Sequence, residues 1–131
     1  MNVIMKLFCV TCLFTCVNVQ FVFADDIDVS GKYFAKNGSE LTLEKTTEKG
    51  QYRITGKSSG DYYWEGIGFY SKECQCIKSV FRYTSHKDKY GDNCGYHKFM
   101  VKNNGNTLIN QGGGWNSLDE FGKSSEYTRK K

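Results

Sequence analysis

Residues 31–57 read GKYFAKNGSELTLEKTTEKGQYRITGK, and polar and apolar side chains alternate along much of this stretch. Leu41 and Leu43, for example, share one side of residues 40–45. A period of two is typical of β-strands that bury one face. Asn37-Gly38 precedes this segment, and both residues tolerate the positive φ that a tight hairpin turn requires. The stretch therefore predicts antiparallel strands joined by short turns.

The same period continues along the chain, and no segment beyond residue 30 has a helical period. Turns such as Asn103-Asn104-Gly105-Asn106 separate the segments. A meander removes its exposed edges by closing on itself, so we expect an all-β, single-domain, eight-stranded antiparallel up-and-down barrel. A β-sandwich is the alternative, because its strands follow the same spacing. The predicted strands are residues 31–36, 40–45, 51–57, 62–70, 75–83, 95–103, 107–111 and 126–130.

The N-terminal residues have the parts of an export signal. Lys6 precedes the apolar run 7–17, and a small residue follows before two aspartates. A membrane anchor is the alternative, but polar residues interrupt the run before it reaches the roughly 20 apolar residues that a span needs. We expect a cleaved signal peptide at 1–24 and a β-barrel domain at 25–131, with no stable membrane span after cleavage. The predicted location is secreted or periplasmic.

Composition narrows the classes of function. The chain has 24% charged residues, 15% aromatic residues, no proline and a formal net charge of +4. The aromatic content favours a packed core over disorder. The positive charge is small and scattered, so we expect no nucleic-acid partner.

Three cysteines follow the predicted signal peptide: Cys74, Cys76 and Cys94. An odd number in an exported protein allows at most one internal disulfide, and the pairing stays open, with a Cys74–Cys76 link among the possibilities. Together with His97, these residues also have the types and short spacings of zinc ligands. A regular hairpin would separate Cys74 and Cys76 from Cys94 by a strand of about 30 Å. We therefore predict no metal site and no cofactor.

Three short motifs open the predicted domain: Ser30-Gly31-Lys32-Tyr33, then Asn37-Gly38-Ser39-Glu40-Leu41-Thr42-Leu43, then Gly50-Gln51-Tyr52. They resemble the start of calycin-type barrels, the lipocalin-like and avidin-like proteins, and look most like the avidin-like branch. Tyr33 stands where that branch has a tryptophan, so biotin binding is not carried over. The resemblance implies an exported eight-stranded barrel that binds a ligand.

Alternation also indicates which side chains line such a barrel. In 75–83 and 95–103 it places Phe81, His97 and Phe99 inside and Arg82 outside. Glu65 points inward if Ile67 and Phe69 do, and outward if a bulge at Gly66 shifts the register. In the predicted ligand site, aromatic side chains provide contact area, and Glu65 or His97 orients the ligand. The predicted set is Tyr33, Trp64, Glu65, Phe81, His97, Phe99 and Trp115.

These features predict a binding protein without catalytic activity. Its partner is either a small apolar or aromatic molecule in the barrel mouth or an extracellular protein bound through the rim loops 71–73 and 84–94. Inhibition of an extracellular hydrolase through those loops is one alternative, and exposed Tyr62, Tyr70 and Tyr90 would suit it.

An enzymatic alternative rests on Glu65, Arg82 and His97. Their order resembles that of small secreted guanyl-type ribonucleases, which would make the carboxylate the base, the imidazole the acid and the guanidinium the phosphate ligand. Those enzymes pack a helix on the sheet, and no segment here predicts one.

Overall fold

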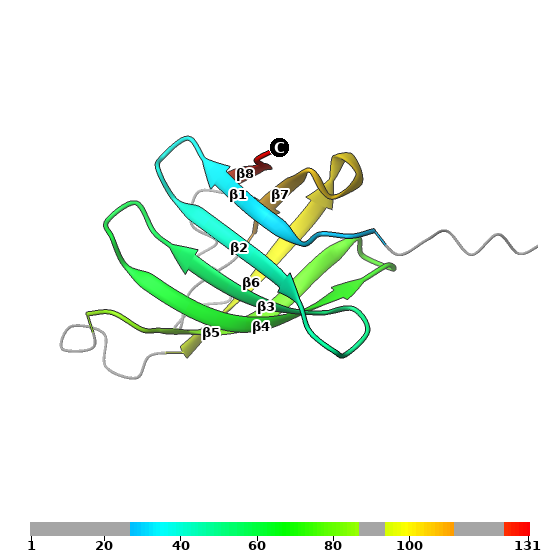
Figure 1. The fold of residues 1–131 in the computed structure, drawn as a ribbon, viewed down its shortest axis with the longest axis horizontal. Helices are drawn as coiled ribbons and strands as arrows, with labels where there is room; N and C mark the ends of the chain where they lie inside the picture. The colour runs from blue at the N-terminus through cyan, green and yellow to red at the C-terminus, as the bar shows by residue number, and fades with distance from the viewer. Residues whose placement is uncertain (1–26, 87–93, 112–124) are drawn as a thin grey trace, which may run out of the picture.

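A computed structural model describes residues 27–86, 94–111 and 125–131 of the chain. The described residues form eight strands and one short 3₁₀ turn, and none of them lies in an α-helix (Figure 1). The elements are β1 (Gly31–Ala35), β2 (Glu40–Lys45), β3 (Gln51–Lys57), β4 (Tyr63–Ser71), β5 (Cys76–Tyr83), β6 (Cys94–Lys102), η2 (Asn103–Gly105), β7 (Thr107–Asn110) and β8 (Glu126–Arg129).

The strands form one closed sheet. Each pairs antiparallel with the next in the sequence, and β8 pairs with β1. Tyr33 of β1, for example, lies opposite Leu41 of β2 on one side and Arg129 of β8 on the other. The predicted all-β, eight-stranded up-and-down barrel is therefore confirmed, and the sandwich alternative is not the fold. Closure pairs both edges of the meander, which would otherwise be open to association.

The strand bounds agree with the sequence prediction to within one residue at each end. β2 and β3 match residues 40–45 and 51–57 without change. β6 stops at Lys102, one residue early, because Asn103 and Asn104 adopt φ angles of 51° and 53° and begin the η2 turn. Asparagine tolerates this left-handed conformation better than most residues, so the same residues that marked a turn in the sequence end the strand.

The core occupies the barrel interior, and every strand contributes to it. Burying one large apolar side chain stabilises the fold by about 1.5–3 kcal/mol. Each core side chain packs against side chains from other strands of the barrel. Closure of the sheet and formation of the core therefore depend on each other. The buried apolar core residues are Val29, Tyr33, Leu41, Leu43, Tyr52, Ile54, Trp64, Ile77, Phe81, Phe99, Val101, Leu108 and Tyr127.

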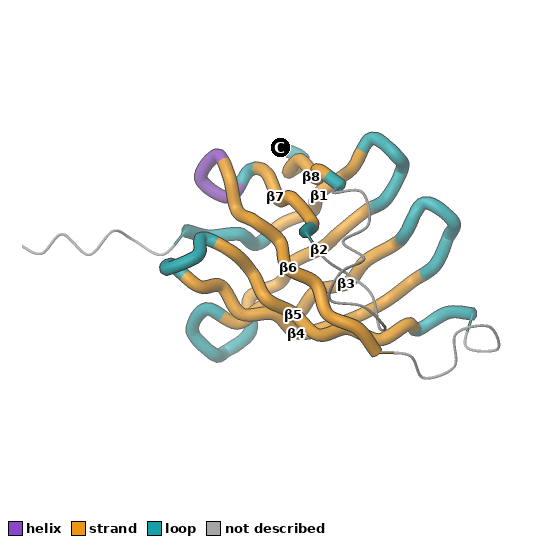
Figure 2. The backbone as a smooth tube through the Cα atoms, turned by 180° about the vertical axis from the view of Figure 1, so that it is seen from behind, coloured by secondary structure: helices purple, strands orange, loops and turns teal. Residues whose placement is uncertain are grey.

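The barrel has two ends with different surroundings (Figure 2). At one, here called the η2 end, residues 27–30 meet the η2 turn and the end of β8. The other end, here called the Trp64 end, contains the turn between β3 and β4 and the first residues of β6. The predicted signal peptide 1–24 lies outside the described residues. Within the described ranges, no helix has the length and apolar character needed to cross a membrane.

Candidate functional site

Four of the predicted ligand-binding side chains meet inside the barrel near the Trp64 end. Trp64, Phe81, His97 and Phe99 are all buried, with at most 8% of each residue exposed. The imidazole of His97 stacks on the ring of Phe81, with centroids 4.1 Å apart and an interplanar angle of 8°. Its centroid is also 4.6 Å from that of Trp64 and 5.2 Å from that of Phe99. Alternation therefore placed Phe81, His97 and Phe99 correctly, whereas it had left open which side of residues 62–70, and so Trp64, faces inward.

These rings pack onto glycines of the neighbouring strands. Trp64 pairs with Gly56 of β3, and a Cβ atom at Gly56 would overlap the indole ring. Phe81 pairs with Gly66 on one side and Gly95 on the other, and its ring covers Gly95. Glycine in a strand marks such close approach. The space over Gly56 and Gly95 is thus occupied by the protein's own aromatic side chains.

His97 and Ser79 are buried polar residues in this aromatic cluster. They lie directly opposite each other on β6 and β5. Among the described residues, the Nδ1 atom of His97 and the Oγ atom of Ser79 have no hydrogen-bond partner. Burial lowers the pKa of His97 from 6.5 to about 4, so the imidazole is neutral at physiological pH. A neutral ring among apolar rings costs less to bury than an imidazolium ion.

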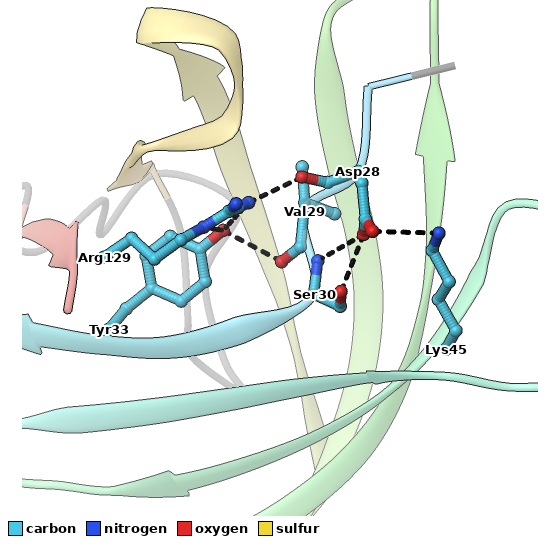
Figure 3. A network of polar contacts seen from close by, with 6 residues as sticks. All are labelled: Asp28, Val29, Ser30, Tyr33, Lys45 and Arg129. Carbon is cyan, nitrogen blue, oxygen red and sulfur yellow. Dashed lines mark hydrogen bonds and ion pairs between the residues drawn. The ribbon is translucent and has the colours of Figure 1, made fainter. Parts of the chain in front are cut away.

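Tyr33, another predicted ligand residue, lies at the opposite end and has a structural role (Figure 3). Its hydroxyl is 2.8 Å from the carbonyl oxygen of Val29 and 2.7 Å from that of Gly105. It also accepts hydrogen bonds from Nε and Nη2 of Arg129, at 3.1 and 2.9 Å. Burial raises the pKa of the phenol despite the nearby guanidinium, so the hydroxyl keeps the proton that it donates. This side chain connects β1, the η2 turn and β8.

Asp28 extends the same network to the surface (Figure 3). Its carboxylate accepts hydrogen bonds from the amide and hydroxyl of Ser30, at 2.9 and 2.7 Å, and lies 2.9 Å from Nζ of Lys45. Burial opposes its ionisation, but these hydrogen bonds and the ammonium group lower its pKa from 3.8 to about 2. The backbone oxygen of Asp28 accepts a further hydrogen bond from Arg129. The η2 end is therefore held together by satisfied polar groups.

Glu65 lies outside the barrel, so its predicted role in orienting an interior ligand does not fit its position. The register of β4 with both neighbours is regular through Gly66, without a bulge. Ile67 and Phe69 point outward with Glu65, with 37% and 54% of their surface exposed. Oε1 of Glu65 accepts hydrogen bonds from Nε and Nη2 of Arg82 at 3.1 and 2.7 Å. Trp64 takes the inward side of the strand.

The residues of the ribonuclease alternative do not come together. Glu65 and Arg82 pair on the outer surface, whereas His97 is buried inside the barrel. The wall of the sheet separates the base candidate from the acid candidate. A general acid and a general base must both reach the reacting atoms, and this arrangement does not meet that condition.

The cysteines are also divided between two places. Cys74 and Cys76 form a disulfide across the β4–β5 turn, with Cα atoms 5.2 Å apart. Cys94 pairs in register with Arg82, near the other end of β5, and is exposed. The sulfur atoms of a zinc site are therefore not assembled. Among the described residues, no group of three or more His, Cys, Asp or Glu could hold a metal ion.

The predicted rim residues have mixed positions. Tyr70 packs against the core rather than standing free of it, and Tyr62 is half-buried, with its ring centroid 4.6 Å from that of His86. Tyr90 and Trp115 lie outside the described residues. The described rim tyrosines thus do not form the exposed surface that the hydrolase-inhibitor hypothesis used.

The outer surface of β4, β5 and β6 carries an exposed apolar patch. Ile67 of β4 lies opposite Val80 of β5, which is 65% exposed, and Val80 lies opposite Tyr96 of β6. Phe69 lies beside this row. An exposed patch of contiguous apolar residues with a polar border is typical of an interaction site. We call this surface the β4–β6 face, and define it as Ile67, Phe69, Val80 and Tyr96 with the surrounding charged residues Arg53, Glu65, Lys78, Arg82 and Lys98.

Two hollows lie on the β4–β6 face, one on each side of the Ile67–Val80 pair. The first, of about 460 Å³, is bounded by the Glu65–Arg82 pair and Cys94. The second, of about 380 Å³, is bounded by Phe69, Tyr96 and the lysines. The pair forms a ridge between two depressions, and each depression has an apolar wall and a charged rim.

Sequence reasoning missed this face. Both sides of residues 62–70 are rich in large apolar groups, so alternation could not show which side faces in. One signal was present in the two glycines: the strand of Val80 and Phe81 approaches Gly66 closely, and Gly68 leaves room for the interior side chains of Ile54 and Ile77. The glycine side should therefore have been assigned to the core.

Comparison with protein-family models, with curated proteins and with solved structures found no match. What is established is a closed eight-stranded antiparallel β-barrel with an aromatic interior and an exposed apolar outer face.

Proposed function

We propose that this chain is an exported, calycin-like barrel that binds another protein through the β4–β6 face. The observation that carries the proposal is the Ile67–Val80 ridge with Phe69 beside it, exposed on a barrel whose sheet has no free edge. Exposed apolar side chains lower the solubility of the protein and do not stabilise its fold. A partner that covers them explains why they are present.

The packing of the interior near the Trp64 end supports this choice over a small ligand bound there. Trp64 and Phe81 rest on glycines, and His97 stacks on Phe81 and lies close to Trp64 and Phe99. A small-molecule site needs a concave cavity that buries most of the ligand. The hollows described above instead lie on the outer surface, open to a partner of protein size.

Export is part of the proposal and can be tested separately. It is supported by the apolar N-terminal run and by the Cys74–Cys76 disulfide, which an oxidising compartment favours. Expression of the full chain in a secretory host should yield protein in the medium. The mass of the secreted protein, measured by mass spectrometry, should correspond to a chain whose first residue is close to residue 25.

The binding test compares three forms of the protein: the wild type, Ile67→Glu and Phe34→Glu. Phe34 is a matched control because it is 36% exposed, against 37% for Ile67, and lies on the outer side of β1. Each form is immobilised and exposed to the extracellular proteins of the source organism. We expect a protein, identified by mass spectrometry, that the wild type and Phe34→Glu retain and Ile67→Glu loses.

The same samples can contradict the proposal. Retention that is equal for all three forms, or a complete lack of retained protein, argues against the β4–β6 face as a binding surface. Native mass spectrometry of the wild type provides a second measurement. A small molecule co-purifying with the barrel would favour the interior site over the face.

A further inference from the structure

The charges of the β4–β6 face indicate what kind of protein it binds, an inference that rests on the proposed function. Four cationic side chains surround the Ile67–Val80 ridge, and Glu65 is the carboxylate among them. Oε1 of Glu65 accepts two hydrogen bonds from Arg82, and its Oε2 atom lies 3.8 Å from Nη2 of Arg53. The single acid is therefore already neutralised, and the face keeps an excess of positive charge. The cationic residues are Arg53, Lys78, Arg82 and Lys98.

The two lysines are placed unfavourably for the barrel alone. Lys78 and Lys98 lie directly opposite each other on β5 and β6. Like charges at directly opposed positions destabilise a sheet. Phe69, not a carboxylate, is the neighbour of Lys78 on β4, and neither lysine has a carboxylate partner within the described residues. A carboxylate from outside would remove this repulsion.

We infer that the partner presents an acidic segment with two apolar side chains that enter the two hollows on either side of the Ile67–Val80 ridge. Each hollow lies between the Ile67–Val80 row and the next row of outward side chains. Successive rows are two residues apart along the strands, or about 7 Å, and so are the two hollows. That is also the spacing of side chains two residues apart in an extended segment. Carboxylates flanking the apolar pair would then reach Lys78 and Lys98 at one side and the arginines at the other.

Other occupants fit the face less well. A second copy docked by two-fold symmetry would bring two sets of cations together, since a symmetric interface matches a surface with itself. An anionic membrane would satisfy the charge, but a membrane has no side chains to fill hollows of about 460 and 380 Å³. A protein segment satisfies both the charge and the shape.

The test uses a phage-displayed library of random 12-residue peptides selected on the full-length wild-type protein. Peptides that also bind Ile67→Glu are removed. We expect the remaining peptides to combine Asp or Glu with large apolar residues. Their affinity should fall at least about tenfold in each of the single variants Lys78→Glu and Lys98→Glu, and should weaken with added salt.

Lys32→Glu is the matched charge control, because Lys32 is an exposed lysine on β1, away from the face. It should change the affinity less than about twofold. Each single lysine variant should fold normally, since a glutamate at either position faces the other lysine and converts a repulsive pair into an attractive one. Thermal unfolding checks this point before binding is compared.

The outcomes separate this inference from the proposed function. Face-dependent peptides that are neutral or basic, or that ignore the lysine substitutions, overturn the acidic partner and leave the protein-binding face intact. If no peptide distinguishes the wild type from Ile67→Glu, the proposed function itself fails. Binding to vesicles of phosphatidylcholine and phosphatidylserine that Ile67→Glu abolishes would replace the partner by a membrane. A dimer in sedimentation that Ile67→Glu dissociates would replace it by a second copy.

Discussion

The two ends of the barrel interior bury polar side chains in opposite ways. At the η2 end, the hydroxyl of Tyr33 has carbonyl and guanidinium partners from three parts of the chain. Near the Trp64 end, the Nδ1 atom of His97 and the Oγ atom of Ser79 have no such partner in the described part of the chain. One end gains stability from its polar groups, and the other bears the cost of desolvating them. The comparison shows that a single closed sheet can be held by hydrogen bonds at one end and by ring packing at the other.

The largest expected effect comes from removing the ring packing. Trp64→Ala should lower the free energy of unfolding by about 3–5 kcal/mol, because it leaves a cavity beside Gly56 and His97. Urea denaturation followed by far-ultraviolet circular dichroism measures this loss. A loss below about 1 kcal/mol would show that the aromatic cluster is not what holds this end together.

A slightly smaller effect is expected from acid. The pKa of His97 is about 4 in the folded barrel and 6.5 when unperturbed. Between these values the unfolded chain binds more protons, so the free energy of unfolding should fall as the pH drops from 6.5 to 4, by about 3 kcal/mol in total. Below pH 4 this contribution should level off.

Two variants isolate that titration. His97→Phe keeps a ring in the cluster and should abolish the loss between pH 6.5 and 4, whereas His86→Gln, at an exposed position, should retain it. The η2 end should respond in a different window, because the lowered pKa of Asp28 delays its loss of stability until the pH falls from 3.8 towards 2. Denaturant midpoints measured across this range test both windows. An acid loss that His97→Phe leaves unchanged would assign it to other groups.

The next effect in size concerns the hydroxyl of Tyr33. Tyr33→Phe keeps the ring but removes the one hydroxyl proton that the carbonyl groups of Val29 and Gly105 share and an acceptor of Arg129. We expect the free energy of unfolding to fall by about 1–3 kcal/mol. Amide hydrogen exchange should rise first around the η2 turn. Unchanged stability would mean that water replaces the hydroxyl without cost.

The smallest effect is expected from the matching change near the Trp64 end. Ser79→Ala also removes one buried hydroxyl, but this hydroxyl has no hydrogen-bond partner within residues 27–86, 94–111 and 125–131. We expect the stability to stay the same or rise by less than about 1 kcal/mol. Measuring the free energy of unfolding of Ser79→Ala and of Tyr33→Phe by the same denaturant method compares a buried hydroxyl at each end directly. A loss as large as that of Tyr33→Phe would show that Ser79 has a partner in solution.

Much of the fold and part of the candidate site could be predicted from local pattern. The alternation of residues 40–45 and the Asn37-Gly38 turn are properties of adjacent residues, and both recur in the structure as predicted. The inward position of His97 and the outward position of Arg82 followed from the same period. The side of β4 that faces inward could not be predicted this way, because large apolar residues occupy both sides.

The sequence by itself determined the eight strands, their antiparallel order and the sidedness of most of them, because a period of two and a turn residue act over a few neighbouring positions. Only the tertiary structure decided that Trp64 covers Gly56, that Tyr33 meets Arg129 across 96 residues of sequence, and that Ile67 stands outside beside Val80. These outcomes depend on contacts between strands, which exist only once the sheet has closed. The proposed binding surface belongs to this second group, since its residues come from separate strands and meet only on the folded barrel.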